Sequence, residues 1–171
     1  MQPSITAILS LAEIFDNLTN TQFELVASIC EPAHHKKGET LIQENENSDE
    51  MYIIGRGGVE IIVTPGFSAN IGATSLNPDP IILTELRQGQ VFGEIALVDQ
   101  GVRSATARVS RPDTMILRIQ RKRLMLLCDT YPELGYKIMR NLAADLALKI
   151  RNTDLTLRQY QLMLADAGAI S

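Results

Sequence analysis

The chain has few of the residues from which metal sites and disulfide frameworks are built. Its 171 residues include only two histidines and two cysteines. His34 and His35 are adjacent, so on a strand they point to opposite faces and do not share one metal ion. Cys30 and Cys128 lie in apolar surroundings without a metal-ligand spacing, which predicts free, buried thiols in a reducing cytoplasm. We therefore expect no metal and no disulfide.

The sequence also lacks long hydrophobic runs and a surplus of basic charge. Because it has no run of about 18 apolar residues, we expect no transmembrane helix. Its first residues, MQPSITAILSLAEIF, include an acid and have no basic start, so we expect no secretory signal peptide. The formal net charge is −4, whereas an autonomous nucleic-acid-binding domain usually carries a positive excess. These features predict a cytoplasmic chain that contacts neither membranes nor DNA directly.

Apolar residues make up 45% of the chain, which is enough for one domain with a sizeable core and an appendage. The spacing of apolar side chains predicts a short helix over residues 4–16 and a second helix that includes Cys30 and stops before Pro32. Thr19, with Gln22 three residues later, has the spacing of a capping box at the start of the second helix.

Between about residues 33 and 119 the pattern changes to short runs rich in Ile, Val, Leu and Thr, separated by polar or glycine-containing turns. The runs are HHKK, TLIQE, MYIIG, VEIIVT, IILTEL, ATARV and TMILRI. Their regular spacing predicts an antiparallel sandwich, barrel or roll of about eight strands. The proline-rich segment 65–80 interrupts the pattern, and we expect it to be a long, mobile hairpin loop.

Helical periodicity returns at Arg121. A short helix is predicted to end before Tyr131, with Thr130 as the cap of a following helix that begins at Pro132. That second helix has leucine or isoleucine at every fourth residue from Leu134 to Ile150. At about 33 residues it would be roughly 50 Å long. One small roll cannot cover this length. Part of its apolar stripe therefore needs another partner, and a second copy of the same helix is the simplest candidate.

The segment FGEIALVDQGVRSAT places one acid and one base on a glycine-containing loop. Gly93 allows a tight turn and close backbone approach, and residues 95–98 are expected to form one helical turn whose free N–H groups face an anion. The donors of Arg103 and Ser104 suit phosphate oxygens, while the Glu94 carboxylate only accepts and suits a sugar hydroxyl. The segment therefore fits a ligand that carries a phosphate and a ribose hydroxyl close together.

Two other interpretations remain open. In the first, Glu94 and Arg103 simply pair with each other in a loop, because an enclosed arginine is costly without water, an ion or a carboxylate beside it. Alternatively, the roll belongs to a cupin-type metal enzyme, but metal catalysis needs converging histidine and carboxylate ligands, which two adjacent histidines do not supply.

The same segment resembles the phosphate-binding cassette of the cyclic nucleotide-binding domain family, of the type found in catabolite activator proteins and protein kinase A regulatory subunits. The family pattern is close to F-G-E-(I/L)-A-(L)-x5-R-(S/A/T)-A-T, which residues 92–106 satisfy. GETLI at 38–42 and MYIIGRGGVEI at 51–61 resemble the first hairpins of the family, and YPEL at 131–134 resembles the start of its long helix. The resemblance covers about residues 10–155.

The resemblance implies a mainly β fold with flanking helices, namely an eight-stranded antiparallel β-roll (jelly roll) with N-terminal helices and a long C-terminal helix. It implies three parts: N-terminal helices at 1–31, the β-roll at 32–120 with the cassette at 92–106, and a C-terminal hinge and lid or dimerisation helix at 121–171.

The resemblance also implies residue roles. Arg103 pairs with the cyclic phosphate, to which the Ser104 hydroxyl and the Ala105 backbone add hydrogen bonds. Glu94 accepts a hydrogen bond from the ribose 2′-hydroxyl, with Gly93 beside it. The full implied contact set is Gly93, Glu94, Ile95, Ala96, Arg103, Ser104, Ala105, Ile61, Leu83, Leu86 and Lys149.

Within that set, Ile61, Leu83 and Leu86 match apolar positions around the base. Lys149 lies at about the distance along the last helix from which a side chain closes off the base, as do Asn152 and Thr153. The base itself is adenine or guanine, and the serine that precedes Ala-Thr in the cassette favours cyclic AMP over cyclic GMP.

The chain departs from the family pattern at three turn positions. Val102 stands where many members have proline, and Asn45 and Ser48 stand where glycines are usual. Asparagine tolerates a positive φ, so Asn45 suits the turn. These departures affect loop geometry and leave the ligand contacts in place.

Members of this family regulate a kinase, a channel or a DNA-binding domain, and none of these follows Ile150, where too few residues remain for a winged helix. We therefore expect a stand-alone sensor domain, or one whose output domain was removed, with no enzymatic activity. Ligand is expected to draw the cassette and last helix together and to change how that helix meets an unknown effector protein. The alternative is a dimerisation or interaction module with a degenerate cassette.

Overall fold

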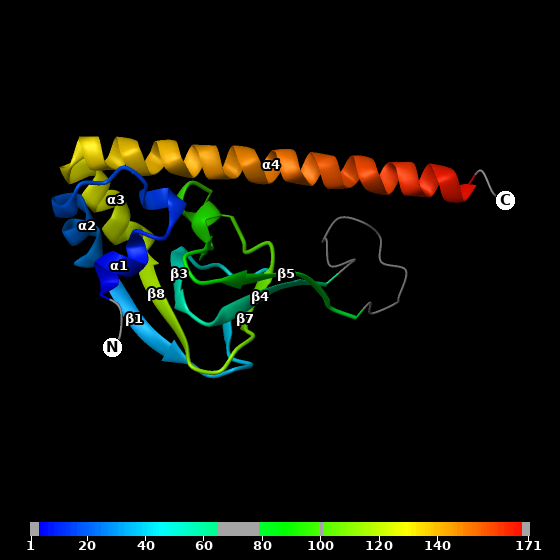
Figure 1. Ribbon diagram of the computed structural model, residues 1–171, viewed down its shortest axis with the longest axis horizontal. Helices are drawn as coiled ribbons and strands as arrows, with labels where there is room; N and C mark the ends of the chain where they lie inside the picture. Colours follow the sequence, from blue (N-terminus) through cyan, green and yellow to red (C-terminus); the bar gives the residue numbers. More distant parts are fainter. Residues whose placement is uncertain (1–3, 65–78, 100, 169–171) are drawn as a thin grey trace.

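The computed structural model describes residues 4–64, 79–99 and 101–168. These residues form two four-stranded antiparallel sheets, with short helices at one end and one long helix along the side (Figure 1). The strand orders are β1-β8-β3-β6 and β2-β7-β4-β5. The predicted fold class, a mainly β roll of eight antiparallel strands with flanking helices, is confirmed.

The elements follow the chain order that the sequence predicts. They are α1 (Ile5–Leu9), the 3₁₀ helix η1 (Glu13–Phe15), α2 (Asn20–Ala27), β1 (Cys30–His35), β2 (Thr40–Ile42), β3 (Glu50–Arg56), β4 (Gly58–Val63), β5 (Ile81–Arg87), β6 (Val91–Phe92), the 3₁₀ helix η2 (Glu94–Leu97), β7 (Thr106–Val109), β8 (Thr114–Gln120), α3 (Arg121–Thr130) and α4 (Pro132–Gly168). Six strands coincide with predicted runs, whereas the HHKK run overlaps only the last two residues of β1. The eighth, β6, is too short to leave such a signal.

The N-terminal helices differ in part from their prediction. Instead of one helix over 4–16, the chain forms α1 and then the single turn η1. The capping box of α2 is confirmed: Gln22 N donates to Thr19 Oγ1 over 3.3 Å, and Thr19 N donates to Gln22 Oε1 over 3.0 Å. The prediction that Cys30 belongs to this helix is wrong, because β1 begins at that residue. Pro32 lies inside β1, which is an edge strand, where proline is tolerated.

Two hydrophobic clusters hold the roll and its helices together. The larger one joins the N-terminal helices, β3, β8, α3 and the first half of α4. Its fully buried members include Phe15, Ile53, Leu117, Leu134 and Ile138. The smaller cluster includes Tyr52 and Phe92, whose rings stack with centroids 5.1 Å apart. Because each such side chain contributes about 1.5–3 kcal/mol on burial, the start of α4 is firmly anchored to the roll.

The last helix continues well past the part that is anchored. It is a single helix of 37 residues, and its outer turns extend beyond the roll (Figure 1). The prediction that Thr130 caps it is wrong, because Thr130 is the last residue of α3 and its hydroxyl donates to Leu126 O over 2.7 Å. In the described part of the chain, neither this helix nor any other combines the length and apolarity needed to cross a membrane.

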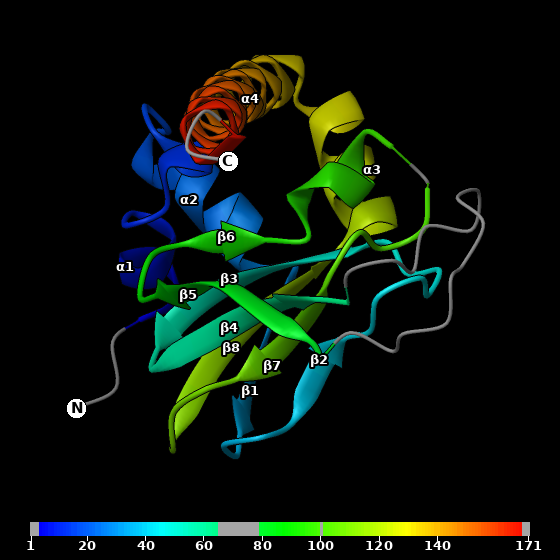
Figure 2. The same ribbon diagram turned by 90° about the vertical axis from the view of Figure 1, so that its right-hand side faces the viewer.

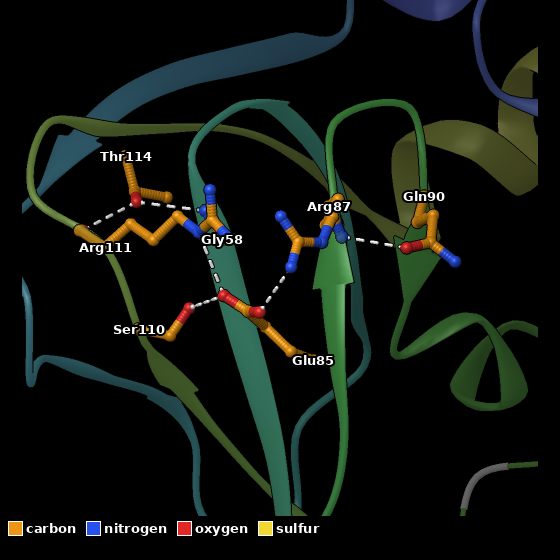
Figure 3. A network of polar contacts seen from close by, with 7 residues as sticks. All are labelled: Gly58, Glu85, Arg87, Gln90, Ser110, Arg111 and Thr114. Atoms are coloured by element: carbon orange, nitrogen blue, oxygen red, sulfur yellow. Dashed lines mark hydrogen bonds and ion pairs between the residues drawn. The ribbon is translucent and has the colours of Figure 1, made fainter.

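The β4–β5 hairpin forms one wall of the roll, and polar contacts fix its base (Figure 3). The Glu85 carboxylate accepts hydrogen bonds from Arg87 Nη2 and Arg111 Nε, each over 2.9 Å, and from Ser110 Oγ over 3.0 Å. The first of these arginines lies on β5 itself, whereas the other two donors lie in the turn between β7 and β8. The predicted mobile loop of 65–80 falls almost wholly outside the described residues.

Candidate functional site

A cavity of about 840 Å³ opens between the cassette, β4, β5 and α4. Its size lies in the range of about 300–1,000 Å³ that is typical of small-molecule sites. Viewed nearly along α4, the helix lies over the end of the roll that carries β6 (Figure 2). The predicted contact residues that line the cavity are Ile61, Leu86, Gly93, Glu94, Ile95, Ala96, Arg103, Ser104, Ala105 and Lys149. Only Leu83 of the predicted set lies elsewhere.

The cassette begins with a left-handed glycine and a short helical turn. Gly93 has φ +74°, a region that favours glycine, and a Cβ there would lie 2.9 Å from Glu50 O and 3.0 Å from Arg103 Nη1. The single turn predicted at 95–98 is present as η2, one residue earlier. Glycine is therefore required at this point both by the backbone conformation and by the arginine that packs against it.

Arg103 is buried, with 6% of its surface exposed. Its Nε donates to Ser48 Oγ over 2.7 Å, its Nη1 to Gly93 O over 3.1 Å and its Nη2 to Glu50 O over 2.6 Å. All three acceptors are uncharged, so they leave the positive charge of the guanidinium uncompensated. Because a guanidinium has five N–H donors, two remain after these contacts.

Glu94 is also buried, with 5% exposed, and it takes a different partner. Its Oε1 accepts a hydrogen bond from Lys149 Nζ on α4 over 2.6 Å, and the same ammonium contacts Asp145 Oδ2 over 2.8 Å. Within the described residues, Glu94 Oε2 takes no hydrogen bond, so it remains available as an acceptor. The interpretation that Glu94 and Arg103 pair only with each other is wrong, since each is held by other groups.

The contacts of Lys149 keep it charged. Burial alone would lower the pKa of its ammonium, but hydrogen bonds to Asp145 and Glu94 and the attraction of both carboxylates outweigh burial, so the pKa lies above the usual lysine value. Lys149 therefore contacts the cassette as a charged ammonium. Asn152, one turn further along α4, also lines the cavity.

The strand residues around the cavity follow the alternation of β5. Leu86 and Thr84 are two residues apart, share one face and line the cavity. Leu83 does not line the cavity. It lies at an irregularity in the pairing of β4 with β5, where Ile61 pairs with Thr84 and Ile62 with Ile82, and it is 60% exposed.

Sequence reasoning also missed lining residues from segments far from the cassette. They are Leu11, Glu13 and Ile14 near the N-terminus, Gln88 to Val91 in the β5–β6 turn, and Asp145 and Leu148 on α4. No local pattern marks them. Within the described residues, no group of three or more His, Cys, Asp or Glu side chains is arranged to hold a metal ion, so the cupin-type interpretation finds no ligand set there.

The family model of the cyclic nucleotide-binding domain matches residues 32–131, which include the whole cassette and both sheets except the first two residues of β1. The chain belongs to the cyclic nucleotide-binding domain family. This family is a regulatory and not a catalytic domain, and the resemblance seen in the cassette is confirmed over most of the roll.

Known relatives match in sequence and in fold. The cyclic AMP receptor protein of Thermus thermophilus is 28% identical over 144 residues, which is 84% of this chain and 60% of that protein. Human cGMP-dependent protein kinase 2 is 26% identical over 121 residues, 71% of this chain and 15% of the kinase. The crystal structure of Thermus thermophilus catabolite activator protein has a TM-score of 0.72 at 27% identity and covers 88% of this chain and 63% of that one. The chain thus spans less than two thirds of each of these relatives.

Proposed function

We propose that the chain is a sensor domain that binds a cyclic nucleotide, cyclic AMP in preference to cyclic GMP, and signals by repositioning α4. One observation carries this proposal: a buried arginine and a buried glutamate line the same cavity, and each keeps hydrogen-bonding capacity after its protein contacts. The cyclic phosphate and the ribose 2′-hydroxyl supply the matching acceptor and donor on one small ligand.

The cassette accounts for the phosphate and the sugar. The two remaining donors of Arg103 bind the phosphate oxygens, and the exposed hydroxyl of Ser104 and the backbone N–H of Ala105 complete that contact. Glu94 Oε2 accepts from the 2′-hydroxyl, while its Oε1 stays on Lys149. Gly93 gives the ribose close access to the backbone.

The base lies between β4, β5 and the side of α4. Ile61 and Leu86 provide apolar contact, and Ile95 and Ala96 close the cavity next to the sugar. Leu83, which lies outside the cavity, is left out of this assignment. Adenine is favoured over guanine on the single ground that Ser104 is the residue common in cyclic AMP binders.

The role of Glu94 predicts a ligand-dependent mutational effect. Glu94→Ala is expected to weaken cyclic AMP binding about 10- to 100-fold, because a hydrogen bond to a charged group is worth about 1.5–3 kcal/mol. Binding of 2′-deoxy cyclic AMP, which lacks the hydroxyl, is expected to change little. Calorimetric titration with both ligands measures these affinities. Glu60→Ala is the control, because Glu60 lies on β4 but does not line the cavity. An equal loss for both ligands would contradict the contact with the ribose.

The contact between α4 and the cassette supplies the route for the signal. Lys149 is the direct link, since its ammonium bridges Glu94 of the cassette and Asp145 of the helix. A ligand that binds Glu94 and lies against α4 prefers the state in which both are close, so it shifts the population toward that state. The helix beyond the roll then presents its apolar side chains differently to an effector protein.

This coupling predicts slower hydrogen exchange in α4 when nucleotide is bound. Amides between residues 145 and 155 are expected to gain protection, less so in Lys149→Met, where the link to the cassette is gone. Lys137→Met is the matched control, because Lys137 lies on the same helix and pairs with Glu133 over 3.0 Å, away from the cavity. Identical exchange with and without nucleotide would exclude a signal through α4.

The outer part of α4 supports a homodimer. Leu146, Ile150, Thr153 and Leu157 are separated by four, three and four residues, the spacing of a coiled-coil seam. Ile150 is 62% exposed and Leu157 55%, and pairing with a second α4 removes both from water. Sedimentation at micromolar concentration is expected to give a dimer, and Ile150→Glu a monomer. A monomeric wild-type chain would refute the dimer.

The remaining parts of the proposal concern the cellular context. The chain acts in the cytoplasm, without a metal, without direct contact to DNA or a membrane, and without catalysing a reaction. Its output passes to an effector protein of unknown identity. The three-part division into N-terminal helices (1–31), roll (32–120) and C-terminal hinge and helix (121–171) describes how these tasks are shared.

A further inference from the structure

Arg103 of the cassette is hydrogen-bonded to the hydroxyl of Ser48, a residue outside the cavity. Ser48 Oγ accepts a hydrogen bond from Arg103 Nε over 2.7 Å, yet Ser48 does not line the cavity. We propose that Ser48 is a positioning residue, which fixes the plane of the Arg103 guanidinium and thereby sets the affinity for the phosphate of the ligand. This inference rests on the proposed function.

The geometry of the guanidinium gives the reason. Gly93 O and Glu50 O hold its two terminal nitrogens, and Ser48 holds the third nitrogen, Nε. Because the group is planar, three fixed nitrogens leave it one orientation, whereas two allow it to tilt about the line that joins them. With all three bonds made, the remaining N–H donors keep one direction, and a phosphate meets them without further ordering.

The charge of the site fits the same role. A hydroxyl orients the guanidinium without neutralising it, so the full charge of Arg103 remains for the phosphate. A residue without a hydroxyl at position 48 could not make this contact, so Ser48 itself supplies this support for the arginine.

The backbone makes the effect of this hydroxyl separable from folding. The turn that carries Ser48 is tied to the cassette by two backbone hydrogen bonds, from Asn45 N to Arg103 O over 2.8 Å and from Arg103 N to Glu46 O over 2.9 Å. Asn45 adopts φ +68°, in the left-handed region that asparagine tolerates. Removing only the hydroxyl at position 48 therefore leaves the turn in place.

The test compares Ser48→Ala, Ser48→Thr and Asn47→Ala with the wild type. Ser48→Ala is expected to bind cyclic AMP up to about tenfold more weakly, because the Arg103 side chain must then be ordered when the ligand binds. Ser48→Thr, which keeps the hydroxyl, and Asn47→Ala, an exposed neighbour in the same turn, are expected to bind like the wild type. Ser48→Thr and Asn47→Ala are expected to keep the wild-type melting temperature, whereas Ser48→Ala leaves a buried N–H of Arg103 without an acceptor and is expected to stay folded with a lower melting temperature.

A second readout needs no ligand. In ¹⁵N spectra of the nucleotide-free protein, the Arg103 Nε–H is expected to exchange slowly with water in the wild type and in Ser48→Thr, and faster in Ser48→Ala. Wild-type affinity in Ser48→Ala, or an affinity loss that Ser48→Thr shares, would overturn the positioning role of Ser48. The proposed function would still stand. A wild type that binds neither cyclic nucleotide would overturn the proposed function, and with it any effect of Ser48 on affinity.

Discussion

Arg103→Ala is expected to weaken cyclic nucleotide binding by at least about 100-fold. Arg103 lines the cavity and keeps two N–H donors beyond its three protein contacts. Two charge-assisted hydrogen bonds of about 1.5–3 kcal/mol each correspond to more than two factors of ten in affinity. Arg103→Lys is expected to fall between the wild type and the alanine variant, because an ammonium keeps the charge but cannot contact Ser48, Gly93, Glu50 and a phosphate in one plane. Calorimetric titration with cyclic AMP gives the affinities.

The matched control is Arg108→Ala. Arg108 lies on β7, also in the roll, and donates to Glu60 Oε1 over 2.7 Å, but it does not line the cavity. Arg108→Ala removes an arginine and its ion pair with Glu60 and is expected to leave the affinity for cyclic AMP unchanged. If Arg103→Ala binds as tightly as Arg108→Ala while both remain folded, the assignment of the phosphate contact is wrong.

Gly93→Ala is expected to lower both the stability of the fold and the affinity for the ligand. A non-glycine residue at a left-handed φ costs about 1–3 kcal/mol of folding free energy. The added Cβ would also lie 2.9 Å from Glu50 O and 3.0 Å from Arg103 Nη1, so it pushes on the carbonyl and on the guanidinium that the ligand needs. Thermal unfolding and calorimetric titration on the same sample separate the two effects.

Gly38→Ala separates backbone strain from the clash. Gly38 has φ +93°, but a Cβ added there meets nothing within 4 Å. It therefore carries the cost of the left-handed backbone without displacing the arginine, and we expect a lower melting temperature with wild-type affinity. If Gly93→Ala behaves in the same way, Gly93 serves the turn and has no part in the site.

The parts of the structure that sequence predicted well are those that depend on local spacing. The Thr19 capping box, six of the seven apolar runs, and the turn after Gly93 each depend on residues within a few positions of one another. The cassette belongs to this class too, since Glu94 and Arg103 lie in one segment and the family pattern fixes their spacing. The structure brings both to one cavity, as that pattern implies.

The parts that sequence missed depend on contacts between distant segments. Cys30 keeps helical spacing, but pairing with Ile119 on β8 places it in a strand. The partner of Lys149 is 55 residues away along the chain, and so is the partner of Arg103 Nε. Neither was accessible to a local pattern. Leu83 depends on such a contact too, because the pairing of β4 with β5 shifts register at this residue.

The departure of the early turn from the family pattern has a physical explanation in the fold. Asn45 replaces glycine at a positive φ without loss of the turn, and Ser48 replaces glycine with a hydroxyl that Arg103 uses. Ser48 thus differs from the family pattern next to a buried charge. This difference shows which side chain holds the Arg103 guanidinium in this chain.

The most direct test of the central claim is calorimetric titration of the nucleotide-stripped protein with cyclic AMP and then with cyclic GMP. Stripping removes any ligand that stays bound through purification and masks the site. The account predicts micromolar or tighter binding of cyclic AMP and weaker binding of cyclic GMP. No heat and no thermal shift with either ligand would contradict it and would leave the interaction module with a degenerate cassette as the better interpretation.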